Sequence, residues 1–183
     1  MVQPRMDPFR LPVDGAEGMP GRQTMASLRA VQFVNIILMA LVAGLLWGTW
    51  FSLSRSMDTL SAQTFLDVGH TMIRNIALPA RIVFPLTFLS SLVVTAMQWR
   101  WRRSAAFWLP AAGTVLFIGT LIITVAIEVP IDNQIKTWTV ATLPADWHAI
   151  RDRWELHHTI RTFLALSSLG AFVAGSLLRN ENG

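Results

Sequence analysis

The residues best suited to chemistry lie between the third and fourth long apolar runs of this 183-residue chain. Glu128 and Asp132 follow the third run and are four residues apart, which is the spacing of one helical face. His157, His158 and Arg161 come just before the fourth run. Imidazole, carboxylate and guanidinium groups can support acid–base catalysis, oxyanion stabilisation and metal binding.

Three uses of this set compete. Imidazoles and carboxylates suit iron, copper, manganese and zinc, and the candidate metal ligands are His70, Glu128 and His158. Adjacent His157 and His158 point about 100° apart on a helix, so only one is expected to join Glu128. In a structural alternative, Arg161 pairs with one of the two carboxylates and the histidines close one end of a helical bundle. The third use is acid–base chemistry without a metal.

Composition places these residues in a membrane protein. Charged residues make up 14% of the chain and hydrophobic residues 52%, against roughly 25% charged residues in a soluble domain. The surplus apolar surface must therefore face lipid, and we expect the bilayer as the principal partner. The absence of cysteine excludes disulfides, thiolate metal sites and a cysteine nucleophile. Net charge is +4, but the basic residues cluster at the ends of apolar runs, so no nucleic-acid partner is expected.

Four stretches contain no charged residue, and they define the elements that must position the polar groups. They are Ala30–Ser54, Ile82–Trp99, Ser104–Ile127 and Thr162–Leu178. A membrane-spanning helix needs about 20 apolar residues; the second and fourth stretches are short and should borrow length from flanking amphipathic turns. The runs do not alternate as barrel strands do. The sequence predicts an all-α fold, a four-helix transmembrane bundle over residues 30–180 with amphipathic helical segments at its outer face.

Arginine placement predicts the orientation of this bundle. Arg100, Arg102 and Arg103 occupy the short loop between the second and third runs, and Arg22 and Arg29 precede the first. Positive charge favours the cytoplasmic side. We therefore expect a multi-pass protein of the cell membrane with both termini in the cytoplasm. The segments 55–81 and 128–161 should lie outside and bring six residues to one level there: His70, Glu128, Asp132, His157, His158 and Arg161.

The first 29 residues contain several prolines and glycines without a periodic pattern. They are predicted to be a disordered cytoplasmic tail. Met25 could equally be the true start, because residues 25–30 would form an ordinary short basic leader. The first apolar run is too long for the core of a signal peptide, so it should remain as an anchor.

Small residues predict where helices approach one another. Gly44 and Gly48 form a GxxxG pattern on the first run, and Gly170 and Ala174 repeat the spacing on the fourth. Such patterns favour helix contact, either within the bundle or between the subunits of a homo-oligomer. Asn35, a lone polar residue in the first run, is expected to make an interhelical hydrogen bond. Pro85 and Pro130 lie where they could bend or break their helices.

The end of the third run and the approach to the fourth resemble the anthrone oxygenase-like family of small four-span membrane proteins. Most of this family is known only as a domain of unknown function. The matching residues are Val129-Pro130-Ile131-Asp132, then Trp154, His158 and Arg161-Thr162, and the resemblance covers roughly residues 30–180. Glu128 and Asp132 stand where asparagine is common in the family, so this site is more acidic.

The resemblance implies an oxygenase-type enzyme, because fungal members oxidise anthrones to anthraquinones with molecular oxygen. In that hypothesis the catalytic residues are His158, Arg161, Glu128 and Asp132. His158, oriented by a carboxylate, removes a proton from a hydrophobic phenolic substrate, and Arg161 stabilises the oxyanion. No cofactor is required, and a redox metal would be an addition.

The alternative hypothesis is a non-catalytic membrane module: an assembly partner, or a protein that binds a small ligand or an ion. It is favoured by the lack of a strong catalytic signature. A transporter is disfavoured because four short spans leave little room for a pathway and no span centre carries an ionisable residue.

Overall fold

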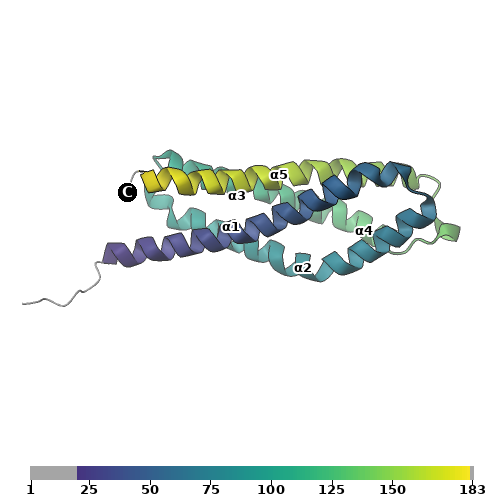
Figure 1. Ribbon diagram of the computed structural model, residues 1–183, viewed down its shortest axis with the longest axis horizontal. Helices are drawn as coiled ribbons and strands as arrows, with labels where there is room; N and C mark the ends of the chain where they lie inside the picture. The colour runs from purple at the N-terminus through teal and green to yellow at the C-terminus, as the bar shows by residue number, and fades with distance from the viewer. Residues whose placement is uncertain (1–19, 182–183) are drawn as a thin grey trace, which may run out of the picture.

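The computed structural model describes residues 20–181, which form a bundle of long helices (Figure 1). The helices are α1 (Pro20–Ser52), α2 (Ala62–Met97), α3 (Ala105–Ile123), α4 (Val129–Ile135) and α5 (Trp147–Glu181). A π-helical segment, η3 (Thr124–Glu128), joins α3 to α4. Short 3₁₀ turns complete the connections: η1 (Ser54–Thr59), η2 (Trp99–Trp101) and η4 (Val140–Thr142). The described residues contain no strand, which confirms the predicted all-α bundle.

Four helical stretches are long and apolar enough to cross a membrane: Met25–Thr59, Ala62–Met97, Ala106–Ile135 and Trp147–Leu178. Each is longer than the apolar run that it overlaps. The second and fourth gain length from the segments that precede their runs, as the sequence predicts. Large apolar side chains are exposed on all four, including Phe33, Leu89, Val115 and Leu177. Such a surface is stable only against lipid, so the chain is a multi-pass membrane protein.

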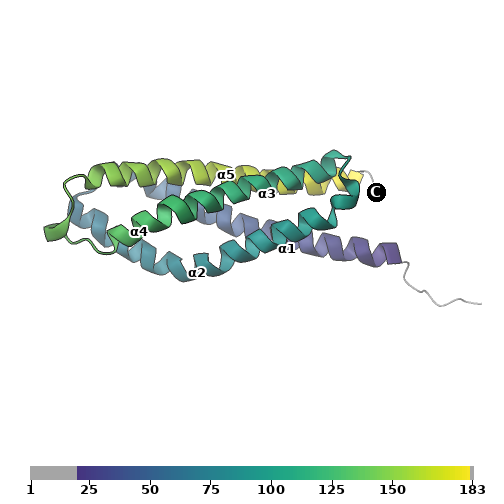
Figure 2. The ribbon, with the colours of Figure 1, turned by 180° about the vertical axis from the view of Figure 1, so that it is seen from behind.

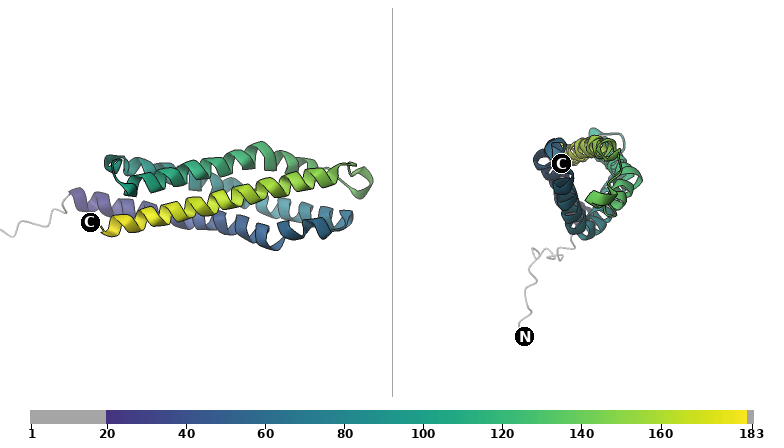
Figure 3. Two further views of the ribbon diagram at one scale, coloured as in Figure 1. Left: turned by 90° about the horizontal axis from the view of Figure 1, so that it is seen from above. Right: turned by 90° about the vertical axis from the view of Figure 1, so that its right-hand side faces the viewer.

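Both ends of the described chain lie at one end of the bundle (Figure 3). The helix α1 begins at Pro20, so residues 20–29, predicted to be part of a disordered tail, are helical instead. Proline is well suited to a first helical turn, where its missing N–H is not needed. Residues 1–19 of the predicted tail lie outside the described residues. The cytoplasmic location of the termini stays a prediction.

Two groups of buried side chains fill the bundle. One includes Met39, Phe84, Phe117 and Phe172 and lies toward the termini; the other is rich in tryptophan and fills the opposite half. We call this opposite half the far half; the turns η1 and η4 mark its end (Figure 2). Its buried members are Met57, Phe65, Leu66, Ile131, Ile135, Trp138, Trp147 and Trp154.

Helices α3 and α5 approach one another closely at glycine positions that the sequence analysis did not single out. A Cβ atom added at Gly175 would lie 2.7 Å from Cδ of Pro110, and one added at Gly113 would lie 3.0 Å from the Phe172 ring. By contrast, a Cβ atom at Gly44 or Gly170 would meet nothing within 4 Å. The same holds for Gly48. Of the two kinds of contact that the sequence left open, these glycines make no close approach within the bundle, and a contact between subunits stays a prediction.

Asn35 behaves as predicted. Its amide nitrogen donates hydrogen bonds of 2.9 Å to the hydroxyls of Ser90 and Ser91 on α2, and its side chain is fully buried. The helix α2 contains both Pro79 and Pro85 and runs through them without ending. It bends along its length (Figure 1), in agreement with the expected effect of a proline inside a helix.

Candidate functional site

The site is built on the π-helical segment that follows α3. Pro130 lies at the start of α4 and cannot donate a hydrogen bond to the preceding turn. The wider turn of η3 comes directly before it, and such segments are frequent at functional sites. The helical path therefore continues through Pro130, where a break was expected. Glu128 is turned into the bundle with 1% of its surface exposed, whereas the neighbouring Val129 is exposed.

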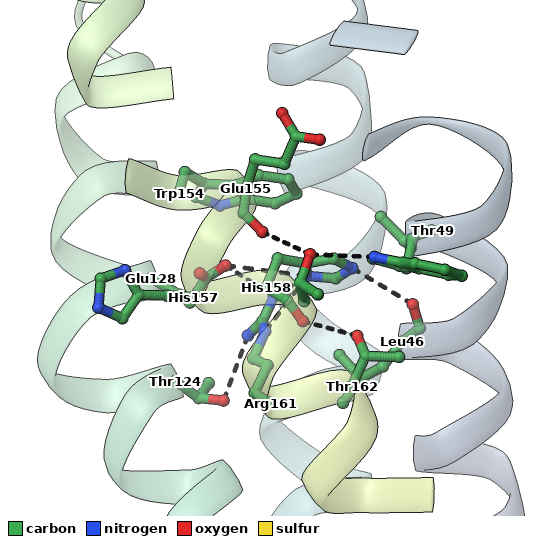
Figure 4. A network of polar contacts seen from close by, with 12 residues as sticks. Leu46, Thr49, Thr124, Glu128, Trp154, Glu155, His157, His158, Arg161 and Thr162 are labelled. Atoms are coloured by element: carbon green, nitrogen blue, oxygen red, sulfur yellow. Dashed lines mark hydrogen bonds and ion pairs between the residues drawn. The ribbon is translucent and has the colours of Figure 1, made fainter. Parts of the chain in front are cut away.

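Arg161 on α5 pairs with Glu128, as Figure 4 shows. The distance from Nη2 of Arg161 to Oε2 of Glu128 is 2.8 Å. The guanidinium also donates from Nη1 to the hydroxyl of Thr124 at 3.2 Å, so it contacts both ends of the π segment. The prediction that Arg161 reaches a carboxylate is confirmed. A buried charge needs such a partner because it has lost the solvation of water.

His158 lies between this ion pair and α1. Its Nε2 is 3.2 Å from the carbonyl oxygen of Leu46, and a carbonyl can only accept, so Nε2 carries the hydrogen. Nδ1 of the neutral ring is then an acceptor, and Arg161 donates to it from Nη2 at 2.9 Å and from Nε at 3.3 Å. Both ring nitrogens are occupied. His158 is therefore placed to orient Arg161. Its role as the base stays a prediction, although these contacts leave the imidazole no free lone pair.

Asp132 and Trp154 complete the network. The indole nitrogen of Trp154 donates to Oδ1 of Asp132 at 3.1 Å, which links α4 to α5. The indole also stacks on the ring of His158, with centroids 4.7 Å apart and planes 4° from parallel. Asp132 thus fixes the indole, the indole supports the imidazole, and the imidazole holds the guanidinium. The tryptophan belongs to the motif seen in the sequence, but only the structure shows its role.

Two of the predicted residues do not join the site. Nε2 of His70 contacts the carbonyl oxygen of Ile135 at 2.8 Å, and Nδ1 of His157 contacts the carbonyl oxygen of Arg153 on its own helix at 2.7 Å. Within residues 20–181 no three His, Asp or Glu side chains are close enough together to hold a metal ion. The predicted metal set of His70, Glu128 and His158 is therefore not assembled, because the ring of His70 is turned to the end of α4.

The network forms one wall of a cavity of about 250 Å³ in the far half of the bundle. Apolar residues from α1 and α2, such as Leu45, Ile76 and Phe84, line most of the remaining surface. Oε1 of Glu128 is buried and has no hydrogen-bond partner among the described residues. Since buried polar atoms are rarely left unpaired, this oxygen retains an unused acceptor position next to the cavity.

Arg81 also lines the cavity, and the sequence analysis did not select it. The available signal was its position directly before the apolar run that starts at Ile82. Thr124 was missed as well, because a threonine within an apolar run usually bonds to its own helix. It does so here, donating to the carbonyl of Thr120 at 2.7 Å, while its oxygen accepts from Arg161.

The fold and the site together define a four-span membrane protein with a buried Arg–Glu network that lines a cavity. The family model for anthrone oxygenase matches residues 72–171, more than half of the chain. The chain therefore belongs to the anthrone oxygenase family, as the resemblance in its sequence indicates. The matched range contains the interacting side chains of Glu128, Asp132, Trp154, His158 and Arg161, whereas Leu46, whose carbonyl contacts His158, lies outside it. Neither the curated proteins nor the solved structures include a significant match to the chain.

Proposed function

We propose that this protein is an oxygenase-type membrane enzyme that converts an activated methylene group of a hydrophobic, phenolic aromatic substrate to a carbonyl group. The observation that carries the proposal is the mostly apolar cavity whose polar wall holds the unpartnered Oε1 of Glu128 beside Arg161. Small-molecule sites generally combine apolar walls with a few convergent polar groups. The cavity volume of about 250 Å³ is close to the lower end of the roughly 300–1,000 Å³ range of ligand pockets.

Glu128 is the base in this proposal. Its carboxylate removes a proton from a methylene carbon between aromatic rings, and the negative charge passes to the conjugated carbonyl oxygen. Arg161 stabilises that oxyanion, since His158 and Thr124 hold its guanidinium in place. A preorganised donor of this kind needs no rearrangement when the charge develops.

Dioxygen then reacts at the carbanion carbon. The first product is a hydroperoxide, after the peroxide oxygen takes a proton, and this hydroperoxide eliminates water to leave the ketone. The carbon loses two hydrogens and gains one oxygen atom; the other oxygen atom leaves with both hydrogens as water. The substrate supplies all four electrons that reduce dioxygen, so no further reductant is consumed.

The test uses the purified protein in a neutral detergent with an anthrone as substrate. Oxygen uptake and the absorbance of the anthraquinone product report turnover. We expect Glu128→Gln to lower turnover by about 10²–10⁴-fold, the usual contribution of a general base. Asp67→Asn is the matched control, because Asp67 is an exposed carboxylate that contacts Gln63 outside the cavity.

A second variant keeps the proposal testable if Glu128→Gln does not fold. Ala77 lines the cavity on α2, so Ala77→Phe should fill the cavity and impair turnover without touching the ion pair. Full activity in folded Glu128→Gln protein would overturn the role of Glu128. Full activity in Ala77→Phe would mean that the reaction takes place elsewhere.

A second candidate function is a ligand-binding module without catalysis. The favouring observation is that His158 has both nitrogens occupied and that Arg161 closes onto Glu128, an arrangement that also suits a purely structural network. Saturable binding of an aromatic probe with no oxygen uptake would support this candidate. Elemental analysis of the purified protein would show whether a redox metal accompanies it.

A further inference from the structure

Arg81 is a cation at the edge of the apolar surface. It lies on α2 between Leu78 and Ile82, whose side chains are 67% and 52% exposed. It also shares one face of the helix with Ala77 and Phe84 by i, i+4 and i, i+3 spacing, and all three line the cavity. Arg81 therefore belongs both to the cavity wall and to the rim of the lipid-facing surface.

The charges that line the cavity are not balanced. Four basic side chains line it, Arg81, Lys136, Arg151 and Arg161, whereas its carboxylates are Glu128 and Asp132. Arg161 pairs with Glu128 at 2.8 Å. Arg151 pairs with the exposed Asp152, which lies outside the cavity lining, at 2.7 Å.

Lys136 donates to the side-chain oxygen of Asn133 at 3.0 Å. Within the described part of the chain, Arg81 has neither an ion pair nor a hydrogen bond to its side chain. A cation beside a lipid-facing apolar surface is stabilised by a partner of opposite charge. A ligand that carries a negative charge would supply that partner.

We propose that the cavity takes an aromatic ligand that carries its own carboxylate, and that Arg81 binds this carboxylate. The inference rests on the proposed use of the cavity for an aromatic substrate and narrows that substrate to an aromatic acid. A guanidinium binds a carboxylate through two parallel hydrogen bonds. The apolar rings lie against side chains such as Phe84, while Oε1 of Glu128 accepts a hydrogen bond from a phenolic hydroxyl or receives a proton.

The same chemistry could serve the phosphate of a lipid headgroup, because Arg81 is also exposed at the rim. The face that Arg81 shares with Ala77 and Phe84 favours the ligand inside the cavity. An anionic lipid is therefore the alternative partner of Arg81. The experiment must distinguish binding of a lipid phosphate from binding of a ligand carboxylate.

The experiment titrates the full-length protein in neutral maltoside detergent with two fluorescent probes of similar shape, anthracene carboxylate and anthracene methanol. We expect the wild type to bind the carboxylate at least about tenfold more tightly. Arg81→Gln should weaken binding of the carboxylate by about ten- to a hundredfold, as the loss of hydrogen bonds to a charged group does. It should leave binding of the alcohol unchanged, and Arg81→Lys should restore part of the preference.

Arg74→Gln is the matched control, because Arg74 is exposed two turns away on the same helix and does not line the cavity. The inference is overturned by equal affinities for the two probes or by an unchanged preference in Arg81→Gln. The titration is repeated in phosphatidylcholine nanodiscs with and without phosphatidylglycerol. Loss of the wild-type preference when phosphatidylglycerol is added would assign Arg81 to lipid headgroups and would also overturn it.

Failure of this inference can be told apart from failure of the proposed function. Binding of the probes requires no turnover, so a carboxylate preference without oxygen uptake would leave the inference standing and remove only the oxygenase activity. Oxygen uptake with a neutral anthrone, combined with equal binding of the two probes, would support the oxygenase activity and overturn the inference about Arg81.

Discussion

Replacing Glu128 by leucine leaves the guanidinium of Arg161 buried without its carboxylate. Nη2 of Arg161 lies 2.8 Å from Oε2 of Glu128, and the side chains of Glu128 and Arg161 are 1% and 11% exposed, respectively. At that separation the Coulomb attraction is about 6 kcal/mol for an effective dielectric constant of about 20. Loss of one partner from a buried pair usually costs about 3–5 kcal/mol, because the remaining charge is left unpaired. We therefore expect Glu128→Leu and Arg161→Met each to destabilise the protein by about that amount.

The double variant Glu128→Leu/Arg161→Met should be more stable than either single variant. It removes both charges, and apolar replacements of buried ion pairs are often nearly neutral. In the double variant Nδ1 of His158 no longer receives a hydrogen bond, which should lower the free energy of unfolding by about 1–3 kcal/mol. The hydroxyl of Thr124 keeps its hydrogen bond to the carbonyl of Thr120. The coupling energy of the cycle should therefore be at least about 3 kcal/mol, at the upper end of measured values.

The assay is reversible unfolding in mixed micelles with a denaturing detergent, followed by circular dichroism of the helices. The four proteins of the cycle are compared under identical conditions, and Asp67→Asn again serves as the control for loss of an exposed carboxylate. Single-variant costs below about 1 kcal/mol that simply add in the double variant would refute the reasoning. That result would mean that water reaches the pair and screens it.

Three further outcomes are expected. Gly175→Ala should destabilise the bundle by about 1–3 kcal/mol, since its Cβ atom would lie 2.7 Å from a proline carbon on α3; Gly170→Ala, with open space around it, should change unfolding by less than about 0.5 kcal/mol. Asn35→Leu should cost about 1 kcal/mol in the same unfolding assay, because it removes both hydrogen bonds to α2. The chain has no native cysteine, so single cysteines report topology directly. An impermeant maleimide should label Ala141→Cys from outside the cell and Arg103→Cys only after permeabilisation, and the reverse pattern would contradict the predicted orientation.

Much of the fold follows from local properties of the chain. Run length, charge depletion and flanking amphipathic turns are sufficient to predict four helical spans, because lipid offers the backbone no alternative hydrogen-bond partners. The pairing of Arg161 with a carboxylate is predictable for a related reason: a charge at this depth needs a partner, and Glu128 ends the neighbouring apolar run. The bond made by Asn35 follows from the same requirement.

Side-chain direction depended on the tertiary structure. The π turn at η3 inserts a residue into the helical repeat and turns Glu128 inward. A uniformly apolar run contains no pattern that predicts such a turn. His70 and His157 have the residue type and approximate level of His158, but their rings face backbone carbonyls instead. Residue type and spacing give the level of a group along the bundle, whereas its bonding partners depend on how neighbouring helices are rotated.

The same distinction applies to helix packing and to the cavity. The GxxxG pattern of Gly44 and Gly48 is visible in the sequence, yet the close approach occurs at Gly113 and Gly175, where α3 meets α5. The sequence by itself determined that lipid surrounds the protein and that four helices span it. It also determined which charged residues lie at one end of the bundle. Only the tertiary structure decided which helices touch and that Arg81 lines the cavity, because both depend on contacts between segments far apart in the chain.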